Sequence, residues 1–261
     1  MDLGLDGRRV IVTGASRGIG AAAAAALAAE GARCALVARD RAALDAVAAA
    51  LPNDPVVVVG DLSTAAGVDA SVASAVEGLG GLDALVNNAG SSPGGTLEQV
   101  TDAQWQEAFD LKVMGYVRAM RAAIPHLRRA GGGRIVNVGG TAGIRASEGY
   151  VLAALIPALV HITRTTAELV GRDGITVTLL HPGPTLTDRL RTMLGPAAAR
   201  AGVPVEDFAR DAVGAQLPLG RVGTAEEVAR LITVLCSDLA GWVTGAGVLV
   251  DGGAARGVVA F

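Results

Sequence analysis

Lysine is almost absent from this sequence. Lys112 is the sole lysine among 261 residues, and every other basic side chain except histidine is an arginine. The formal net charge is −3, charged residues make up 18% of the chain, and the arginines are scattered rather than clustered. A protein that grips nucleic-acid phosphates carries a basic patch or stripe. We therefore expect no nucleic-acid partner.

Apolar leader sequences, cysteine frameworks and metal-binding spacings are missing as well. The start of the chain mixes acids and arginines and leads straight into a strand pattern, without a stretch typical of a signal peptide or a membrane span. Cys34 and Cys236 are too few for a disulfide framework and are expected in the core. His126, His161 and His181 lack the spacing and acidic companions of a metal site. These absences predict a cytoplasmic protein with no membrane contact and no metal.

What the sequence has in abundance is a regular alternation of short β-branched runs and alanine-rich stretches. Seven runs are predicted to be strands: Arg8–Gly14, Arg33–Arg39, Pro55–Asp61, Leu82–Asn88, Gly133–Val138, Gly174–Leu180 and Gly247–Gly253. Strands without polar alternation are buried on both faces, which requires helices on each side of a parallel sheet. The sequence therefore predicts one α/β domain over residues 1–261, a Rossmann-type doubly wound fold with a seven-stranded parallel sheet.

Two stretches between the strands are unusual. Ala21–Ala32 is nearly all alanine, the strongest helix former, and predicts a close-packed helix. Leu186–Leu217 is the longest segment without a strand pattern, and long excursions after a strand commonly carry binding residues. We expect this second segment to form a substrate loop.

A glycine-rich loop, "VTGASRGIG", joins the first predicted strand to the first helix. Gly14, Gly18 and Gly20 allow a tight turn and let a pyrophosphate approach the helix N-terminus. The spacing departs from the usual dinucleotide fingerprint, and at this point the sequence resembles the short-chain dehydrogenase/reductase family.

Further motifs agree with that resemblance in order and spacing. "GDLS" at 60–63 resembles the family's adenine-contacting turn, "NNAG" at 87–90 its fourth-strand motif, "HPGPTLT" at 181–187 its nicotinamide-side loop, and "VTGAGVLVDGG" at 243–253 its last strand. Together the motifs cover nearly the whole chain. The resemblance implies a cofactor site made of Gly14, Ser16, Arg17, Gly18, Ile19, Gly20, Arg39, Asp61, Leu62, Asn88, Ala89, Gly90, Pro182, Gly183 and Thr187.

The charges at the end of the second strand indicate which cofactor is used. An acid there binds the ribose hydroxyls of NAD, whereas a 2′-phosphate needs a cation. Ala38 takes the acid's place, Arg39 follows it, and Arg17 lies in the glycine loop, so two guanidiniums can clamp a 2′-phosphate. The alternative is that both are surface arginines paired with Asp40. We expect NADP(H) in preference to NAD(H).

The resemblance also implies four catalytic residues, namely a serine, a tyrosine, a lysine four residues beyond the tyrosine, and an asparagine. In the family's register these positions hold Gly140, Ala153, Pro157 and Lys112. An error of register does not change this result, because no Tyr-x-x-x-Lys exists anywhere in the chain. The sequence therefore predicts an atypical member without the Asn-Ser-Tyr-Lys tetrad.

Pro157 and the nearby glycines predict a remodelled site. A proline inside a helix removes a backbone donor, so the helix either kinks at Pro157 or starts later, with Pro157 near its first turn. Gly139 and Gly140 are expected to enlarge the space opposite. The wall of that space is predicted to be apolar through Leu152, Leu155 and Ile156.

Two residues are candidates for the missing chemistry. Lys112 can extend its ammonium into the space near Pro157, where burial lowers a lysine pKa toward useful acid/base values. Alternatively its stem packs along the helix and its head reaches solvent. Tyr150 is expected at the mouth of the site, for packing more than for proton transfer. Thr141 is expected to face elsewhere.

These observations leave three functions open. The first is an NADP(H)-dependent oxidoreductase for a small apolar carbonyl or alcohol substrate, with Lys112 and Tyr150 as candidate catalytic residues. The second is a non-redox enzyme of a secondary pathway, such as a cyclase, dehydratase or isomerase. The third is a cofactor-binding pseudoenzyme. The resemblance implies a homotetramer or homodimer that uses helices at Asp102–Arg129 and Tyr150–Gly171 together with the last strand.

Overall fold

Seven parallel strands form the centre of the molecule. The computed structural model describes residues 2–90, 94–144 and 149–255. The strands lie in the order β3-β2-β1-β4-β5-β6-β9, and every neighbouring pair is parallel. Their bounds are β1 Arg9–Thr13, β2 Arg33–Ala38, β3 Val56–Val59, β4 Ala84–Asn87, β5 Gly133–Val138, β6 Ile175–Pro182 and β9 Gly247–Val250. The predicted α/β Rossmann-type sheet is confirmed.

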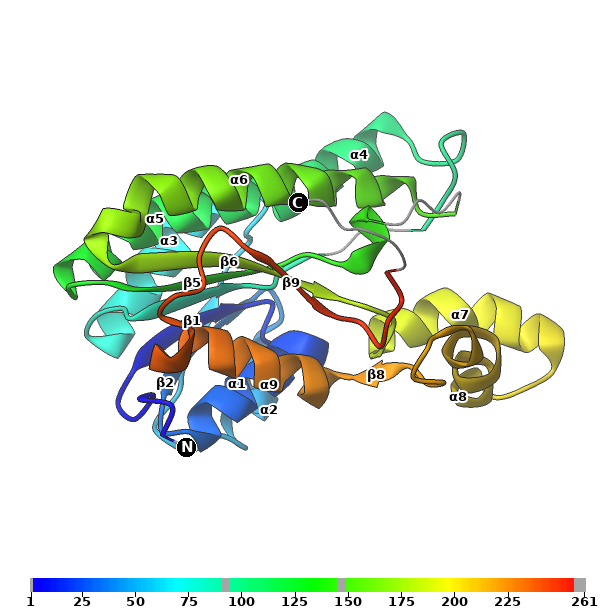
Figure 1. Ribbon diagram of the computed structural model, residues 1–261, viewed down its shortest axis with the longest axis horizontal. Helices are drawn as coiled ribbons and strands as arrows, with labels where there is room; N and C mark the ends of the chain where they lie inside the picture. Colours follow the sequence, from blue (N-terminus) through cyan, green and yellow to red (C-terminus); the bar gives the residue numbers. More distant parts are fainter. Residues whose placement is uncertain (1, 91–93, 145–148, 256–261) are drawn as a thin grey trace.

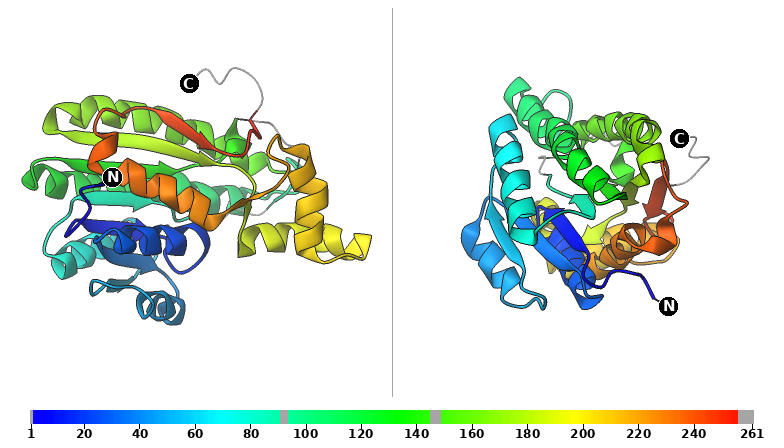
Figure 2. Two further views of the ribbon diagram at one scale, coloured as in Figure 1. Left: turned by 60° about the horizontal axis from the view of Figure 1, so that its bottom comes forward. Right: turned by 90° about the vertical axis from the view of Figure 1, so that its left-hand side faces the viewer.

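Helices cover both faces of the sheet (Figures 1 and 2). One face carries α1 Gly18–Ala29, α2 Arg41–Ala48 and α9 Ala225–Cys236; the other carries α3 Ala65–Leu79, α4 Asp102–Phe109, α5 Gly115–Arg129 and α6 Leu155–Val170. The alanine-rich stretch forms α1, whose small side chains allow close packing against α9. No helix in the described part of the chain is long and apolar enough to cross a membrane.

The alternation of side chains along β1 shows how the two layers are stabilised. Val10 and Val12 pack with α1 and α9, whereas Ile11, between them, packs with α3 and α5 on the opposite face. All three are fully buried. Burial of a valine or isoleucine side chain contributes about 1.5–3 kcal/mol, so one short strand stabilises both layers.

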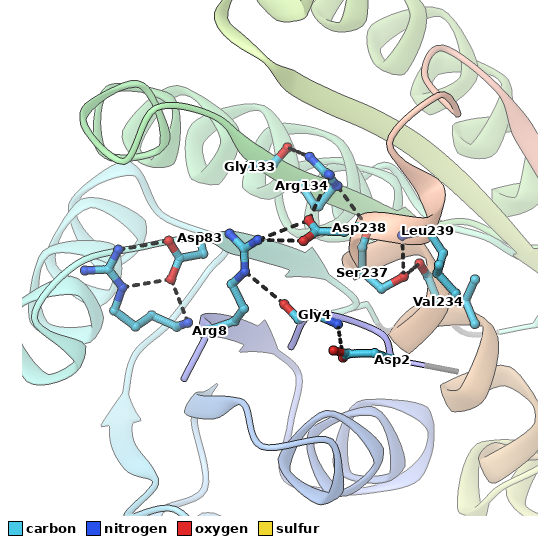
Figure 3. A network of polar contacts seen from close by, with 11 residues as sticks. Asp2, Gly4, Arg8, Asp83, Gly133, Arg134, Val234, Ser237, Asp238 and Leu239 are labelled. Carbon is cyan, nitrogen blue, oxygen red and sulfur yellow. Dashed lines mark hydrogen bonds and ion pairs between the residues drawn. The ribbon is translucent and has the colours of Figure 1, made fainter. Parts of the chain in front are cut away.

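The end of the sheet opposite the glycine loop is closed by ion pairs. Arg8 donates from Nη2 to both carboxylate oxygens of Asp238, at 3.0 Å each, and Arg134 donates to the same carboxylate at 3.3 Å (Figure 3). Arg9 holds Asp83 through Nε and Nη2 at 2.8 and 2.9 Å. These contacts join the starts of β1, β4 and β5 to the turn after α9.

Residues 186–217 stand beyond the carboxyl ends of the strands (Figure 1). They form α7 Asp188–Ala201, α8 Val205–Phe208 and two short helical turns, consistent with the absence of a strand pattern. The segment begins inside β7, Thr185–Leu186, which pairs with β8, Gly223–Thr224. The sequence did not indicate this two-stranded ribbon because each strand is only two residues long.

Candidate cofactor and active site

The glycine loop between β1 and α1 leaves no room for a side chain at Gly14 or Gly20. Gly14 and Gly18 have φ values of +66° and +57°, which favour glycine. A Cβ on Gly14 would meet the Ala89 Cα at 2.8 Å, and one on Gly20 would meet the Gly14 carbonyl oxygen at 2.2 Å. No side-chain cap or acidic residue occupies the first turn of α1. The loop therefore presents backbone N–H groups and a positive dipole end, which suit a pyrophosphate.

The segment after β4 stabilises this loop from the side. Thr13 Oγ1 accepts hydrogen bonds from the backbone N–H groups of Asn88 and Ala89, at 2.9 and 3.1 Å. The Asn88 side chain donates to the carbonyl oxygens of Thr13 and Gly14, at 3.0 and 3.2 Å. The "NNAG" motif thus fixes the glycine loop by its own polar groups.

The segment after β6 contacts both the end of the last strand and the glycine loop. A Cβ on Gly183 would lie 2.7 Å from the Asp251 Cα, so the backbone approaches the residue after β9 closely there. The Thr187 methyl group lies 3.5 Å from the Cβ position of Gly18. The structure thus brings Thr187, of the predicted nicotinamide-side residues Pro182, Gly183 and Thr187, to the predicted phosphate loop.

The two predicted phosphate-clamp arginines, Arg17 in the glycine loop and Arg39 directly after β2, are exposed. No hydrogen bond or ion pair within the described part of the chain holds Arg17 or Arg39. Asp40 instead caps α2, accepting from the Ala43 N–H at 3.1 Å. Hydrogen bonds from Ser63, and to a lesser extent the charge of Arg39, lower the pKa of Asp61. Arg39 is therefore close to the adenine-contacting turn and is not engaged by Asp40.

The remaining predicted cofactor residues lie on the same segments. Ser16 and Ile19 are partly buried in the glycine loop, and Leu62 is 6% exposed beside Asp61. Close backbone packing at Gly14, Gly20 and Gly183, which leaves no room for side chains, is compatible with a bound dinucleotide.

Lys112 lies in a π-helical turn, Asp110–Met114, that separates α4 from α5. A π-helical turn changes the direction of the side chains that follow it, and such turns frequently occur at functional sites. The Lys112 Nζ donates to the Tyr116 hydroxyl at 2.7 Å and to the Val138 carbonyl oxygen at 2.6 Å. A Cβ on Gly90 would lie 3.1 Å from this Nζ. The alternative prediction, in which the Lys112 amine reaches solvent, is therefore wrong. The amine is held at the ends of β4 and β5.

The surroundings of Lys112 weaken its affinity for a proton. Burial, together with the nearby positive charge of Arg189, lowers the pKa of Lys112 from its ordinary value to about 7. Burial raises the pKa of the Tyr116 hydroxyl well above its ordinary value. At neutral pH the amine is thus present in both protonation states, while the tyrosine stays protonated.

The three other positions that the resemblance makes catalytic lie around the same end of the sheet. Gly140 is extended, and a Cβ there would meet only the Pro182 carbonyl oxygen, at 4.0 Å, so this point is open. Ala153 is 6% exposed in a 3-10 turn, Val151–Ala154. Pro157 is exposed in the first turn of α6. The helix starts late rather than kinking, because the first four N–H groups of a helix need no intrahelical partner.

The predicted enlargement is correct at Gly140 and wrong at Gly139. A Cβ on Gly139 would meet the Leu179, His181 and Ile156 side chains at 3.2–3.3 Å, so that space is filled. The predicted apolar wall is buried in small clusters instead of facing an open cavity: Leu152, Leu155 and Ile156 are 2%, 9% and 8% exposed. Their neighbours in helices α4 to α6 cover them, which the sequence pattern could not show.

Tyr150 meets an arginine from the substrate segment. Arg189, in the first turn of α7, donates to the Tyr150 hydroxyl and lies over its ring, 5.7 Å from the centroid. Thr141 is buried and donates to the Pro182 carbonyl oxygen at 3.3 Å, the same atom that a Cβ on Gly140 would face, so its hydroxyl does not point away from the predicted site. Sequence reasoning assigned no site role to Tyr116 or Arg189. Tyr116 could have been found from its i, i+4 spacing to Lys112, whereas nothing local identifies Arg189.

Comparisons with known proteins agree with this geometry. A family model described as enoyl-(acyl carrier protein) reductase matches residues 14–255. A 3-oxoacyl-(acyl-carrier-protein) reductase of Pseudomonas aeruginosa is 34% identical over 96% of this chain and 98% of its own. The crystal structure of L-sorbose reductase from Gluconobacter frateurii, complexed with NADPH and L-sorbose, is 32% identical with a TM-score of 0.94, covering 99% of this chain and 100% of that chain.

A short-chain dehydrogenase from Burkholderia cenocepacia in complex with NADP is also similar, at 34% identity and a TM-score of 0.86, covering 97% of this chain and 99% of that chain. The chain therefore belongs to the short-chain dehydrogenase/reductase family of NAD(P)-dependent oxidoreductases. Among the described residues, no group of three or more His, Cys, Asp or Glu side chains is placed to hold a metal ion.

Proposed function

We propose that the protein is an atypical NADP(H)-dependent oxidoreductase that reduces a small apolar carbonyl compound or oxidises the corresponding alcohol. The observation that carries this proposal is Lys112, whose Nζ lies at the carboxyl ends of β4 and β5 with a pKa of about 7. A proton donor acts best when its pKa is near the working pH. The single catalytic domain is taken to be residues 1–261, with its substrate segment at residues 186–217.

In this proposal the glycine loop and the two arginines near it bind the cofactor. The backbone of Gly14, Gly18 and Gly20 receives the pyrophosphate, and Arg17 and Arg39 hold a 2′-phosphate, which favours NADP(H) over NAD(H). Both arginines are exposed beside the crevice, and Asp40 is engaged as a helix cap. Bound NADPH supplies the hydride. The complexes of L-sorbose reductase with NADPH and of the Burkholderia cenocepacia dehydrogenase with NADP support this assignment.

The substituted tetrad makes Lys112 the proposed proton donor. Residues 153 and 157 are not tyrosine and lysine, so the site lacks a positioned acid that would accelerate the reaction by roughly 10²- to 10⁴-fold. Residue 140 supplies no polarising hydroxyl, which would accelerate the reaction by about another 10²-fold. The Lys112 ammonium can donate its proton to the substrate oxygen and recover it from solvent. Tyr150, fixed by Arg189, orients the substrate at the mouth. The exposed Met193 and Val203 of the substrate segment support an apolar ligand.

A binding and turnover experiment tests this function. We expect titration with NADPH and NADH to give tight NADPH binding and weak NADH binding. A carbonyl panel that includes L-sorbose and 3-oxoacyl thioesters should then show NADPH oxidation by the wild type, with at least a tenfold lower rate for Lys112→Met. Product formation without NADPH oxidation would favour the non-redox enzyme, and NADPH binding without any turnover would favour the pseudoenzyme. Failure to bind either cofactor would contradict the proposal.

A further inference from the structure

The hydrogen-bonding geometry at Lys112 matches a neutral amine. A neutral amine has two N–H groups, and the Nζ has two acceptors, the Tyr116 hydroxyl and the Val138 carbonyl oxygen. An ammonium has a third N–H, for which the described residues offer no oxygen or nitrogen acceptor and only the Tyr116 ring, whose centroid lies 4.6 Å from Nζ. Tyr116 donates its own hydroxyl proton to Val138 at 3.1 Å, so its oxygen remains available to Lys112. When both acceptors are used, the nitrogen lone pair occupies the remaining tetrahedral direction.

We propose that Lys112 is also a nucleophile, whose neutral Nζ attacks the carbonyl carbon of a small aldehyde or ketone and forms an iminium ion. This inference goes beyond the proposed hydride transfer and does not depend on it. It assigns a covalent site for carbonyl compounds to the only lysine of the chain.

The glycines and charges near the amine are compatible with such a step. Gly140, two residues beyond Val138, has almost no atoms around its Cβ position, and Gly90 packs against the Lys112 stem and Nζ without a side chain of its own. The charged and titratable groups that face the amine in the described structure are Arg189 and Tyr116. Neither is a carboxylate that would stabilise the Lys112 ammonium. Burial and the charge of Arg189 together lower the pKa of Lys112 to about 7.

The chemistry balances without an oxidant or reductant. The lone pair of Nζ forms a C–N bond, the C=O π electrons move to oxygen, and a proton passes from nitrogen to oxygen to give a carbinolamine. Uptake of one proton from solvent and loss of one water then give the iminium. Water reverses the sequence and restores the amine. While it exists, the iminium withdraws electrons and acidifies the C–H bonds of the adjacent carbon, which is chemistry that a non-redox enzyme can use.

The test uses pentane-2,4-dione on the intact wild-type protein without NADPH. A 1,3-diketone condenses with a neutral amine to a stable enaminone, which absorbs in the near ultraviolet and adds a defined mass. Because Lys112 is the sole lysine, peptide mapping has only to separate it from the N-terminal amine. The same chain unfolded in guanidinium serves as the internal control, since its lysine has an ordinary pKa.

At neutral pH the neutral fraction of an amine with a pKa near 7 exceeds that of ordinary lysine by on the order of 10³-fold. We expect the Lys112 enaminone to form at least tenfold faster in the folded protein than in the unfolded chain. Borohydride should likewise trap a propanal adduct at Lys112 of the folded protein. Labelling confined to the N-terminal amine, or slower labelling of Lys112 in the folded protein, would overturn the proposal.

Two variants separate this result from the proposed function. Lys112→Arg keeps a cation but has no nucleophilic lone pair at neutral pH, and Lys112→Met keeps the stem alone. Neither should form the adduct. Because labelling is measured without cofactor and NADPH oxidation is measured without diketone, each proposal can fail while the other stands.

Discussion

At the scale of single residues, the buried amine of Lys112 links function to stability. Its native pKa of about 7 lies below the unfolded value of about 10.4. Between these values the unfolded chain binds more protons, so the free energy of unfolding rises with pH by up to about 1.4 kcal/mol per unit. We predict that Lys112→Met is more stable than the wild type at neutral pH. Its advantage should shrink as the pH approaches 10, in urea unfolding at several pH values. Parallel pH curves for the two proteins would contradict this prediction.

Arg39 carries a second prediction at this scale. A hydrogen bond to a charged group contributes about 1.5–3 kcal/mol, so Arg39→Ala should weaken NADPH binding about tenfold or more and change NADH binding little. Calorimetric titration measures both. The matched control is Arg41→Ala, because Arg41 is a nearby arginine engaged with Asp45 at 2.9 Å. Equal losses for NADPH and NADH, or an equal effect in the control, would mean that Arg39 does not bind a 2′-phosphate.

The sequence predicted much of the candidate site at this scale and missed part of it. The glycine loop, "NNAG" and Lys112 were predicted because each is a local pattern or a single conspicuous residue. Whether the Lys112 side chain points inward could not be predicted, because its direction depends on the Val138 carbonyl oxygen at the end of β5, which is distant in the sequence. The Arg189 contact with Tyr150 was missed for the same reason, since it joins segments far apart in the chain.

At the scale of elements, the position of Pro157 at the start of α6 determines how much this proline changes the free energy of unfolding. Pro157 is the third residue of that helix, where a backbone N–H has no intrahelical acceptor. We predict that Pro157→Ala changes the free energy of unfolding by less than about 1 kcal/mol. By contrast, Thr165→Pro, at an exposed site in the middle of the same helix, should cost about 3 kcal/mol or more. Chemical unfolding of both variants checks this, and similar costs would contradict the late start of α6.

The strands and their order were predictable because buried β-branched runs and turn residues are local signals. The π-helical turn at Asp110–Met114 was not, because "DLKVMG" lies within one continuous helical pattern. Directly after this turn, α5 packs closely on the segment after β3, where a Cβ on Gly115 would meet the Leu62 carbonyl oxygen at 2.7 Å. That contact joins two segments distant in the chain, so no local sequence pattern predicts it.

At the scale of the whole molecule, exposed apolar side chains favour self-association. Trp242 is 99% exposed before the edge strand β9, Leu249 within that strand is 37% exposed, and Leu169 on α6 is 68% exposed. Burial of such side chains between copies would stabilise an oligomer. We predict a homotetramer of four 26.0 kDa chains, about 104 kDa by light scattering. A monomer mass would contradict this prediction.

The central claim is that this fold places one titratable amine at the end of its sheet, ready for chemistry at neutral pH. The most direct test is an NMR titration of protein labelled at lysine, because a single lysine gives a single side-chain signal. We predict a midpoint near pH 7, which Arg189→Met moves upward by removing a positive charge. A midpoint near the ordinary value of about 10.4 would contradict the proposed role of Lys112, because the residue would then be a permanent cation at neutral pH.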